Sequence, residues 1–540
     1  MVGECYNGAV NNSNLSQLGK TLVDSLRRIE AYETETLARR EKTTVHIPTV
    51  GSTISTAYEQ LRNASEYAED ELLQQRAIRR YLKRELSFHV KVPTARLADE
   101  LVTELTQSEY LPNDFVTKSD IAAIKHHIKH YYDAYWQYAD TQPNIAKRND
   151  FATWTLDVLA VRCEQVLGSH IRQLMFAHFA FLYLQEKVTL KKLRRHHERI
   201  DEADFAIVLY AAIHRSLLKS DNVTVRTALI DSYQQDITDI AKFESFNTKL
   251  DYLLETKTVA YATRIVGRNG AALRFIYTGF FSNDAPLSTQ ALRTPDTLEH
   301  GLRSHIEQEY VALNKRLDKG ILRSIVFLLI TKSIVGFAIE VPYDLLITGA
   351  IIWVPLLINL FFPSIFIAFS RLTLTTPNNR NTKALISQIT DILYGNDEEN
   401  AYAIRIPKES SSIGFNTAYT IMFLVVFAGL SYVLYLLEFN IVQGVIFFIF
   451  LSTAAFLSFR LSRQIHELEV VHAQQGSLSL IRDIMYMPFI YVGQQISYRY
   501  SQVNIVALIL DILIELPLKT ILRLVRQWMS FLNAKKDELL

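Results

Sequence analysis

The chain has 540 residues, of which 49% are hydrophobic and 21% charged, with a formal net charge of +1. This length allows two or three domains. The near-zero charge argues against a general electrostatic field for nucleic acid or acidic substrates, so no nucleic-acid partner is expected. Two cysteines, Cys5 and Cys163, are too few for a disulfide framework and favour a reducing compartment for the N-terminal part.

A sharp change of composition divides the sequence. Residues 1–320 are rich in Glu, Lys, Arg, Gln and Ala, whereas residues 321–540 contain nearly all the long apolar runs. We therefore predict a cytoplasmic helical domain over 1–320, a transmembrane domain over 321–460, and a juxtamembrane and amphipathic region over 461–540. The first twenty residues lack the pattern of a signal peptide, so we expect the first span to direct insertion.

The N-terminal region shows the periodicity of helices. In residues 55–86 apolar side chains recur every three or four positions, which predicts one long amphipathic helix. A second helix is predicted with Ser119 as its N-cap, and another begins at Pro295 and Asp296. No sustained period-two alternation is present, so a multi-helix domain without strands is expected. Breaks are predicted near 88–95, 139–150, 219–223 and 282–296.

Four apolar segments are long enough to span a membrane. Tight links at 340–344 and 438–440 join them into two hairpins. The predicted fold class is therefore all-α: a multi-helix soluble N-terminal domain, a four-span bundle and a C-terminal amphipathic helix. The predicted spans are about 321–339, 345–369, 413–437 and 441–459.

The distribution of basic residues predicts the orientation of these spans. The two links contain no Lys or Arg, whereas basic residues precede the first span, lie between the hairpins and follow the fourth span. The positive-inside rule therefore predicts a multi-pass protein of the cytoplasmic membrane with both termini and the N-terminal domain in the cytoplasm.

The C-terminal segment 503–532 is predicted to form an amphipathic helix kinked at Pro517. Its acidic residues Asp511 and Glu515 precede three basic residues on the same arc. The segment can lie at the membrane surface or partly inside it. The alternative is a cytoplasmic helix packed on the soluble domain.

Motifs for chemistry are scarce. The sequence contains no phosphate-binding loop, dinucleotide-binding turn or nucleophile elbow. We therefore expect no cofactor, and we favour a protein that is not an enzyme. His126 and His130 have the i,i+4 spacing of metal ligands, with Asp133 one turn further on. An exposed helix with scattered histidines has the same pattern, and we predict no metal site.

Basic residues are concentrated in the segment 191–199. They could form a patch for anionic lipid, or a solvated helix face balanced by the acidic residues that follow, and the second interpretation is favoured. The residues are Lys191, Lys192, Arg194, Arg195 and Arg199.

Lys332 lies near the middle of the first predicted span, where an unpaired lysine costs about 2.5–3.5 kcal/mol. The candidate acidic partners are Glu340 and Asp344 at the outer end of the span, or Asp511 and Glu515 if the last helix enters the bilayer. A purely structural lysine is favoured over a site for an anionic solute, a lipid headgroup or a coupled proton.

Two segments of the sequence resemble those of other proteins. They are AYEQLRNASEYAEDELLQQRAIRRYLKREL (57–86) and KGILRSIVFLLITKSIVGFAIEVPYDLL (319–346). They resemble sequences of an uncharacterised bacterial family whose members have a helical N-terminal region followed by membrane hairpins. The resemblance implies a bacterial inner membrane and transfers no function.

These observations favour a membrane-anchored interaction or scaffold protein, with the lipid bilayer as one partner and proteins bound through the N-terminal helical domain. The alternative is a small transporter or channel that uses the intramembrane lysine. Four spans form a small bundle, which leaves homo-oligomerisation open.

Overall fold

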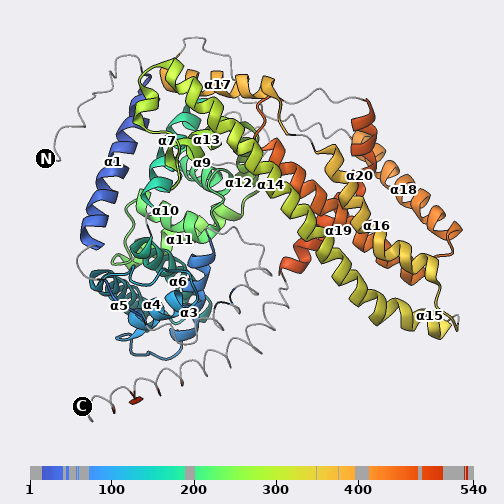
Figure 1. The fold of residues 1–540 in the computed structure, drawn as a ribbon. Coiled ribbons are helices and arrows are strands. Elements are labelled where there is room, and N and C mark those ends of the chain that lie inside the picture. The colour runs from blue at the N-terminus through green and yellow to red at the C-terminus, as the bar shows by residue number, and fades with distance from the viewer. Residues whose placement is uncertain are drawn as a thin grey trace. The chain divides into compact units, whose positions relative to one another are not determined.

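A computed structural model describes most of the chain, and all of its regular secondary structure is helical (Figure 1). Among the described residues the only β-type pairing is an isolated bridge between Thr44 and Thr117. The predicted all-helical class is confirmed for this part of the chain. The described residues are 15–40, 44–47, 56, 59, 72–168, 170–188, 201–347, 349–374, 376–395, 413–471, 477–502, 524, 528, 531, 532 and 535.

The chain divides into two compact units. The first unit comprises residues 12–267, 280–285 and 504–540, and the second comprises residues 1–11, 268–279 and 286–503. Helices of the first unit are α1 (Gln17–Arg40), α3 (Leu73–Glu85), α4 (Leu97–Gln107), α5 (Lys118–Thr141), α6 (Ile145–Leu167), α7 (Ile171–Lys187), α9 (Glu202–Ser216), α10 (Asn222–Ser232), α11 (Ile240–Glu255) and most of α12 (Lys257–Asn269).

One hydrophobic core cluster of the first unit lies where α5 and α6 pack on α3 and α4. Tyr132 and Tyr135 of α5 are buried there and donate hydrogen bonds to the carbonyls of Ser87 and Phe88. The predicted N-cap at Ser119 is wrong: Thr117 caps α5. The Thr117 hydroxyl accepts the Asp120 amide proton and the Asp120 carboxylate accepts the Thr117 amide proton, which satisfies two terminal donors.

The second unit is organised around one uninterrupted helix. Helix α14 (Pro295–Val335) begins at Pro295, as predicted, with Thr294 as its N-cap, and it runs through residue 320, where the composition changes. Its neighbours along the chain are α13 (Ala271–Ile276), the π-helix η3 (Tyr277–Phe281), the 3-10 helix η4 (Thr289–Leu292), the π-helix η5 (Gly336–Glu340), α15 (Val341–Ile347), α16 (Trp353–Thr373), α17 (Asn379–Tyr394), α18 (Ile413–Leu436), α19 (Ile441–His466) and α20 (Ser477–Gln502).

The first hairpin differs from the prediction. The link predicted at 340–344 is helical, because α14 continues through η5 into α15 and ends at Ile347. Pro342 lies just after the π turn and, lacking an N–H group, donates no hydrogen bond to the preceding turn. The chain then turns at Gly349, whose φ of +71° suits glycine, and the second span begins at Trp353 rather than 345.

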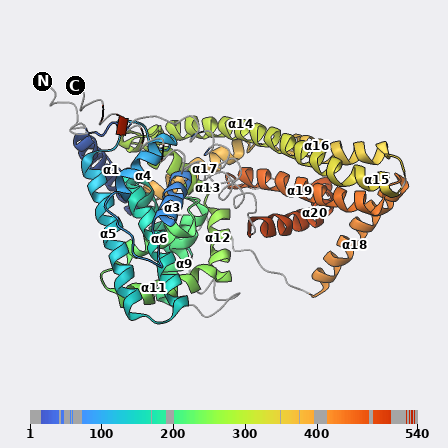
Figure 2. The ribbon, with the colours of Figure 1, turned by 90° about the horizontal axis from the view of Figure 1, so that it is seen from below.

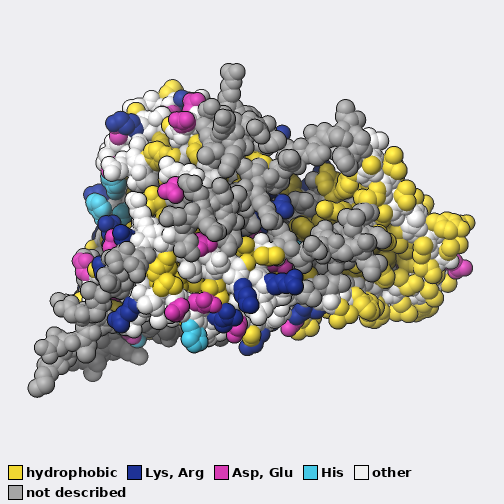
Figure 3. Space-filling view, turned by 90° about the horizontal axis from the view of Figure 1, so that it is seen from above, with side chains coloured by type: hydrophobic (Ala, Val, Ile, Leu, Met, Phe, Trp, Pro, Cys, Tyr) yellow, Lys and Arg dark blue, Asp and Glu magenta, His cyan; other side chains and the backbone are white. Residues whose placement is uncertain are grey.

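Four helices in the described part of the chain are long and apolar enough to cross a membrane. They are Pro295–Ile347, Trp353–Leu372, Thr417–Leu436 and Ile441–His466, which confirms the predicted number of spans. Helices α14, α16 and α19 pack on one another, α20 lies along α19, and α18 contacts α20 (Figure 2). On the face drawn in Figure 3, most of the coloured side chains over this bundle are hydrophobic.

The contact between α19 and α20 is especially close at Gly493. A methyl group at this position would lie 2.7 Å from the Cβ of Phe456 and against the carbonyl of Ser452. Small residues let membrane helices approach closely, and here glycine allows the two backbones to touch.

Away from the apolar part of the bundle, α17 holds the segment that follows α19. The Asn381 side-chain amide donates to the Leu468 carbonyl at 3.0 Å and to the Tyr310 hydroxyl at 2.9 Å. Its carbonyl oxygen accepts the Val470 amide proton at 2.8 Å. One buried side chain therefore connects α17, α14 and the segment that follows α19.

Candidate functional site

Lys332 is buried inside the second unit and forms an ion pair with Glu340. The lysine Nζ lies 2.5 Å from Glu340 Oε1, and the two residues are only 2% and 0% exposed. This is one of the partners that the sequence suggested, but Glu340 lies inside the bundle rather than in a link. An opposite charge at hydrogen-bond distance offsets much of the cost of burying an isolated ammonium group.

The π-helix η5 brings the two charges onto one face. In a regular α-helix, residues eight apart are rotated by about 80° around the axis, so Lys332 and Glu340 would diverge. In η5 the Val341 amide donates to the Gly336 carbonyl, five residues back, which adds one residue to the turn. Around the helix axis, Glu340 therefore lies nearly where the seventh residue after Lys332 would lie in a regular α-helix, about 20° from Lys332.

A neighbouring helix also contacts the lysine. The Nζ atom of Lys332 lies 4.7 Å from the ring centroid of Phe450 on α19. A cation near an aromatic face is attracted by the ring quadrupole, and this attraction is stronger away from water. The ammonium group is thus held between its own helix and α19.

Asp344 forms a second buried polar centre. Its carboxylate accepts hydrogen bonds from Asn440 Nδ2 at 2.8 Å and from Gln443 Nε2 at 2.9 Å. The carbonyl oxygens of the same two amides accept each other's backbone N–H groups in a capping box that begins α19. The helix N-terminus favours the negative charge of Asp344. Together these bonds connect the first hairpin to the second.

Asn359 adds a third link at this end of the bundle. Its side-chain amide donates to the Gln443 carbonyl at 3.1 Å. Helix α16 is therefore bound to the first turns of α19, in which Gln443 also bonds Asp344.

A small notch lies beside the ion pair, between α14 and α16. Its volume is about 50 Å³, and it is lined by both charged residues together with apolar side chains. The principal apolar lining is Phe337, Leu356 and Leu360. The buried charged pair therefore stands beside a small, partly open space whose surface is mainly apolar.

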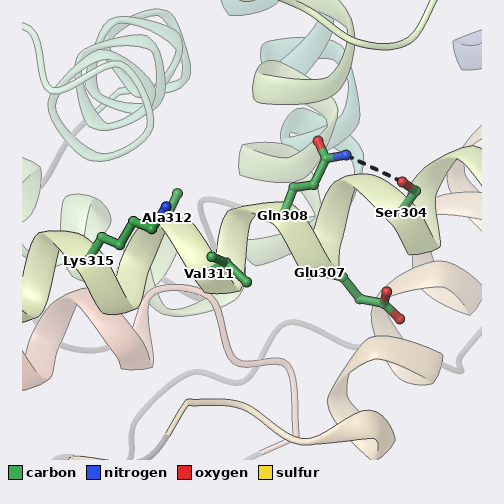
Figure 4. Close-up of a pocket in the computed structure, with 6 residues that line it drawn as sticks. All are labelled: Ser304, Glu307, Gln308, Val311, Ala312 and Lys315. Atoms are coloured by element: carbon green, nitrogen blue, oxygen red, sulfur yellow. Dashed lines mark hydrogen bonds between the residues drawn. The ribbon is translucent and has the colours of Figure 1, made fainter.

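A wider and shallower groove runs along the N-terminal half of α14. It has a volume of about 490 Å³ and is lined by Ser304, Glu307, Gln308, Val311, Ala312 and Lys315. Gln308 Nε2 donates to Ser304 Oγ at 3.5 Å, whereas Glu307 points away from this pair (Figure 4). The groove is an open surface of mixed polarity and holds no arrangement of groups that suggests catalysis.

The candidate metal ligands do not converge. The rings of His126 and His130 stack with centroids 5.9 Å apart, while Asp133 pairs with Lys91 at 3.1 Å. No group of three His, Cys, Asp or Glu residues is placed to hold a metal ion in the part of the chain that the structure describes.

Several predicted features lie outside the described residues. They are the basic residues Lys191, Lys192, Arg194, Arg195 and Arg199, the acidic residues Asp511 and Glu515, most of the helix predicted over 503–532, and most of residues 55–71.

Outside the bundle, Glu164 of α6 is a strongly perturbed carboxyl group. Burial is the main cause that raises its pKa to about 8, and the nearby carboxylate of Asp221 contributes a smaller part of the increase. The closest approach of His170 Nε2 to Glu164 Oε2 is 3.8 Å, and burial lowers the pKa of that imidazole. Both groups therefore favour their neutral forms, which is typical of a buried core contact rather than an ion pair.

Sequence reasoning missed the amides that hold Asp344. The signal was available, because Asn440 and Gln443 have the N-x-x-Q spacing of a capping box directly before an apolar run. The position of Phe450 against Lys332 carried no such signal. No protein-family model, curated protein or solved structure matches the chain.

Proposed function

We propose that the chain is a membrane-anchored interaction protein. Its membrane bundle would hold a helical region at the cytoplasmic face of a cell membrane, where that region binds protein partners. The observation that carries this proposal is the continuity of α14, a single helix of 41 residues that is polar in its first half and apolar in its second.

The packing around α14 supports this role. Its polar half bonds to α17 through Tyr310 and Asn381, and its apolar half packs on α16 and α19. A continuous helix with contacts at both ends transmits position and orientation, because bending it breaks several backbone hydrogen bonds together. A rigid helix of this kind is better suited to anchoring a domain than a flexible linker is.

The proposed orientation places both termini in the cytoplasm, with a basic loop between the hairpins on the same side. The turns after Ile347 and Leu436 contain no Lys or Arg, as the positive-inside rule requires of outer turns. The division into a soluble domain, a bundle and a C-terminal amphipathic helix belongs to the same proposal.

A second candidate function is transport of a small solute or ion. The specific observation in its favour is the notch beside Lys332 and Glu340, which places a space next to buried charges. Ionisable side chains inside a membrane often mark substrate or proton pathways. The small size of the bundle would then require oligomerisation.

One pair of substitutions separates the two functions. Lys332→Met combined with Glu340→Met removes the pair without leaving a charge, so the bundle should still insert and fold. An anchor should retain the same partners, identified by cross-linking in native membranes and quantified by mass spectrometry. The proposal fails if the wild-type chain yields no reproducible partner, or if the double variant abolishes a solute flux that the wild type supports in proteoliposomes.

A further inference from the structure

Helices α14 and α19 pack closely at the end of the bundle where basic residues are found. A methyl group at Gly320 of α14 would lie only 2.9 Å from Leu461 Cδ2 of α19. Further along the same pair of helices, the Nζ atom of Lys332 lies 4.7 Å from the ring centroid of Phe450. The numbering therefore rises along α14 while it falls along α19, so the two helices run antiparallel.

Three basic side chains lie on one side of this contact. In a regular helix, Arg323 and Lys319 are rotated by about 60° and about 100° around α14 from Gly320, both in the same sense. Arg460 is rotated by about 100° around α19 from Leu461, again in this sense when each helix is viewed from its N-terminus. Between antiparallel helices, equal senses of rotation lead to the same side of the contact. Because Gly320 faces Leu461, Arg460 also lies at a level between Lys319 and Arg323, and all three basic residues are exposed.

The positive charge of this cluster is not neutralised by nearby carboxylates. The acidic residues at this end of the bundle pair with other cations: Asp318 with Arg371, Glu467 with Arg463, and Glu309 with Arg316. By contrast, Lys319 and Arg323 form no ion pair within the part of the chain that the structure describes. Their charge can therefore act on an anion from outside the protein.

Exposed apolar side chains follow these charges along α14. Val326, Phe327 and Ile330 are 47%, 44% and 55% exposed, and they belong to a helix that is long and apolar enough to cross a membrane. Their spacing from Arg323 places them on the same face of α14 as the arginine. A phospholipid has the matching arrangement, because its phosphate is joined to apolar chains. Long basic side chains beside an apolar surface extend to the level of lipid headgroups.

We propose that Lys319, Arg323 and Arg460 bind the phosphate of an anionic phospholipid, whose acyl chains lie along the exposed apolar face of α14. Arginine bonds phosphate oxygens through its planar fork of N–H donors, and lysine adds a flexible point charge. Basic sites between membrane helices are suited to such headgroups. The proposal goes beyond anchoring, since it assigns the bundle a preferred lipid and requires no protein partner.

The test uses the full chain, purified in detergent without added lipid. Native mass spectrometry measures its affinity for phosphatidylglycerol and for phosphatidylcholine with the same acyl chains, and we expect the anionic lipid to bind more tightly. Lys319→Gln combined with Arg323→Gln should weaken phosphatidylglycerol binding by about 30-fold, from about fivefold per basic group. Arg380→Gln combined with Lys383→Gln is the matched control. It removes two exposed basic residues of α17 and lowers the net charge equally, so it should bind as the wild type does.

A second comparison tests whether α19 contributes to the site. Arg460→Gln should weaken phosphatidylglycerol binding by about fivefold. Arg463→Gln should not, because Arg463 is rotated away from α14 and pairs with Glu467. These single variants keep the test valid if the double variant of α14 does not fold.

Inorganic phosphate distinguishes a lipid from a free anion. An excess of phosphate should not displace phosphatidylglycerol, since the acyl chains also contribute to binding. Displacement by phosphate alone would overturn the assignment to a lipid. The proposal is equally overturned if the two lipids bind the wild type with the same affinity, or if the test and control variants lose the same affinity.

Discussion

Gly493 of α20 lies directly against the backbone carbonyl of Ser452 on α19, so closely that no Cβ atom fits between them. We expect Gly493→Ala to force the two helices apart and to lower the free energy of unfolding by about 1–3 kcal/mol, the usual cost of overpacking. Unfolding in detergent micelles, followed by circular dichroism, measures the change.

Gly444→Ala on α19 is the matched control. A methyl group at this position meets nothing within 4 Å, and alanine favours a helix by up to about 1 kcal/mol over glycine. Stability should stay equal or increase slightly. An equal loss of stability in the two variants would show that the contact with Ser452 is not the reason why alanine destabilises position 493.

The ion pair predicts a strong asymmetry between single and double substitutions. Lys332→Met leaves the Glu340 carboxylate buried without its cation, which should cost about 3–5 kcal/mol. Adding Glu340→Met removes the isolated charge and should restore most of the lost stability. A double variant as unstable as the single one in the same unfolding assay would contradict a direct coupling between the two residues.

Asp344 should stabilise the junction of the two hairpins through the amides that it bonds. Asp344→Leu leaves Nδ2 of Asn440 and Nε2 of Gln443 without that acceptor, and each unmet donor costs about 1–3 kcal/mol. Asp344→Asn keeps one acceptor oxygen and should lose less. The prediction is checked by ranking the two variants in thermal unfolding, and it fails if leucine is the better tolerated residue.

Glu164 gives a pH dependence outside the bundle. Its pKa in the folded chain is about 8, above the ordinary value of 4.5, so the folded state retains a proton that the unfolded state releases. Its contribution to stability is therefore present below pH 4.5 and is lost as the pH rises from 4.5 to about 8. Glu164→Gln should remove this loss and stabilise the first unit by several kcal/mol above pH 8.

The fluorescence of Trp154, buried in the same helix as Glu164, provides the readout. Unfolding of wild type and Glu164→Gln is compared at pH 5 and pH 9. The two proteins should be similar at the lower pH and differ at the higher one. A pH-independent difference would mean that the substitution alters packing rather than ionisation.

The proposed orientation is tested with single cysteines in a chain that carries Cys5→Ala and Cys163→Ala. Cysteines replacing Gly349 and Glu438, in the two outer turns, should react with a membrane-impermeant maleimide in intact cells. A cysteine replacing Lys383 should react only after permeabilisation. Labelling of position 383 from outside would reverse the proposed topology.

The sequence alone determined the fold class and the number of spans. Apolar periodicity identifies helices, and runs of about twenty apolar residues identify spans, because both signals depend only on local composition and spacing. The start of α14 at Pro295 was predicted for the same reason. Orientation, partners and function stay predictions, since they depend on molecules other than this chain.

The placement of the buried charges was decided by the tertiary structure. The sequence named Glu340 and Asp344 as neighbours of Lys332, but it placed both in a link. It could not foresee that an extra residue in a π turn would rotate Glu340 onto the face of Lys332. Nor could it assign Asp344 to the amides of α19, about a hundred residues further along the chain. Such pairings follow from how helices pack, because burial makes each polar group bond whichever partner the packing brings near.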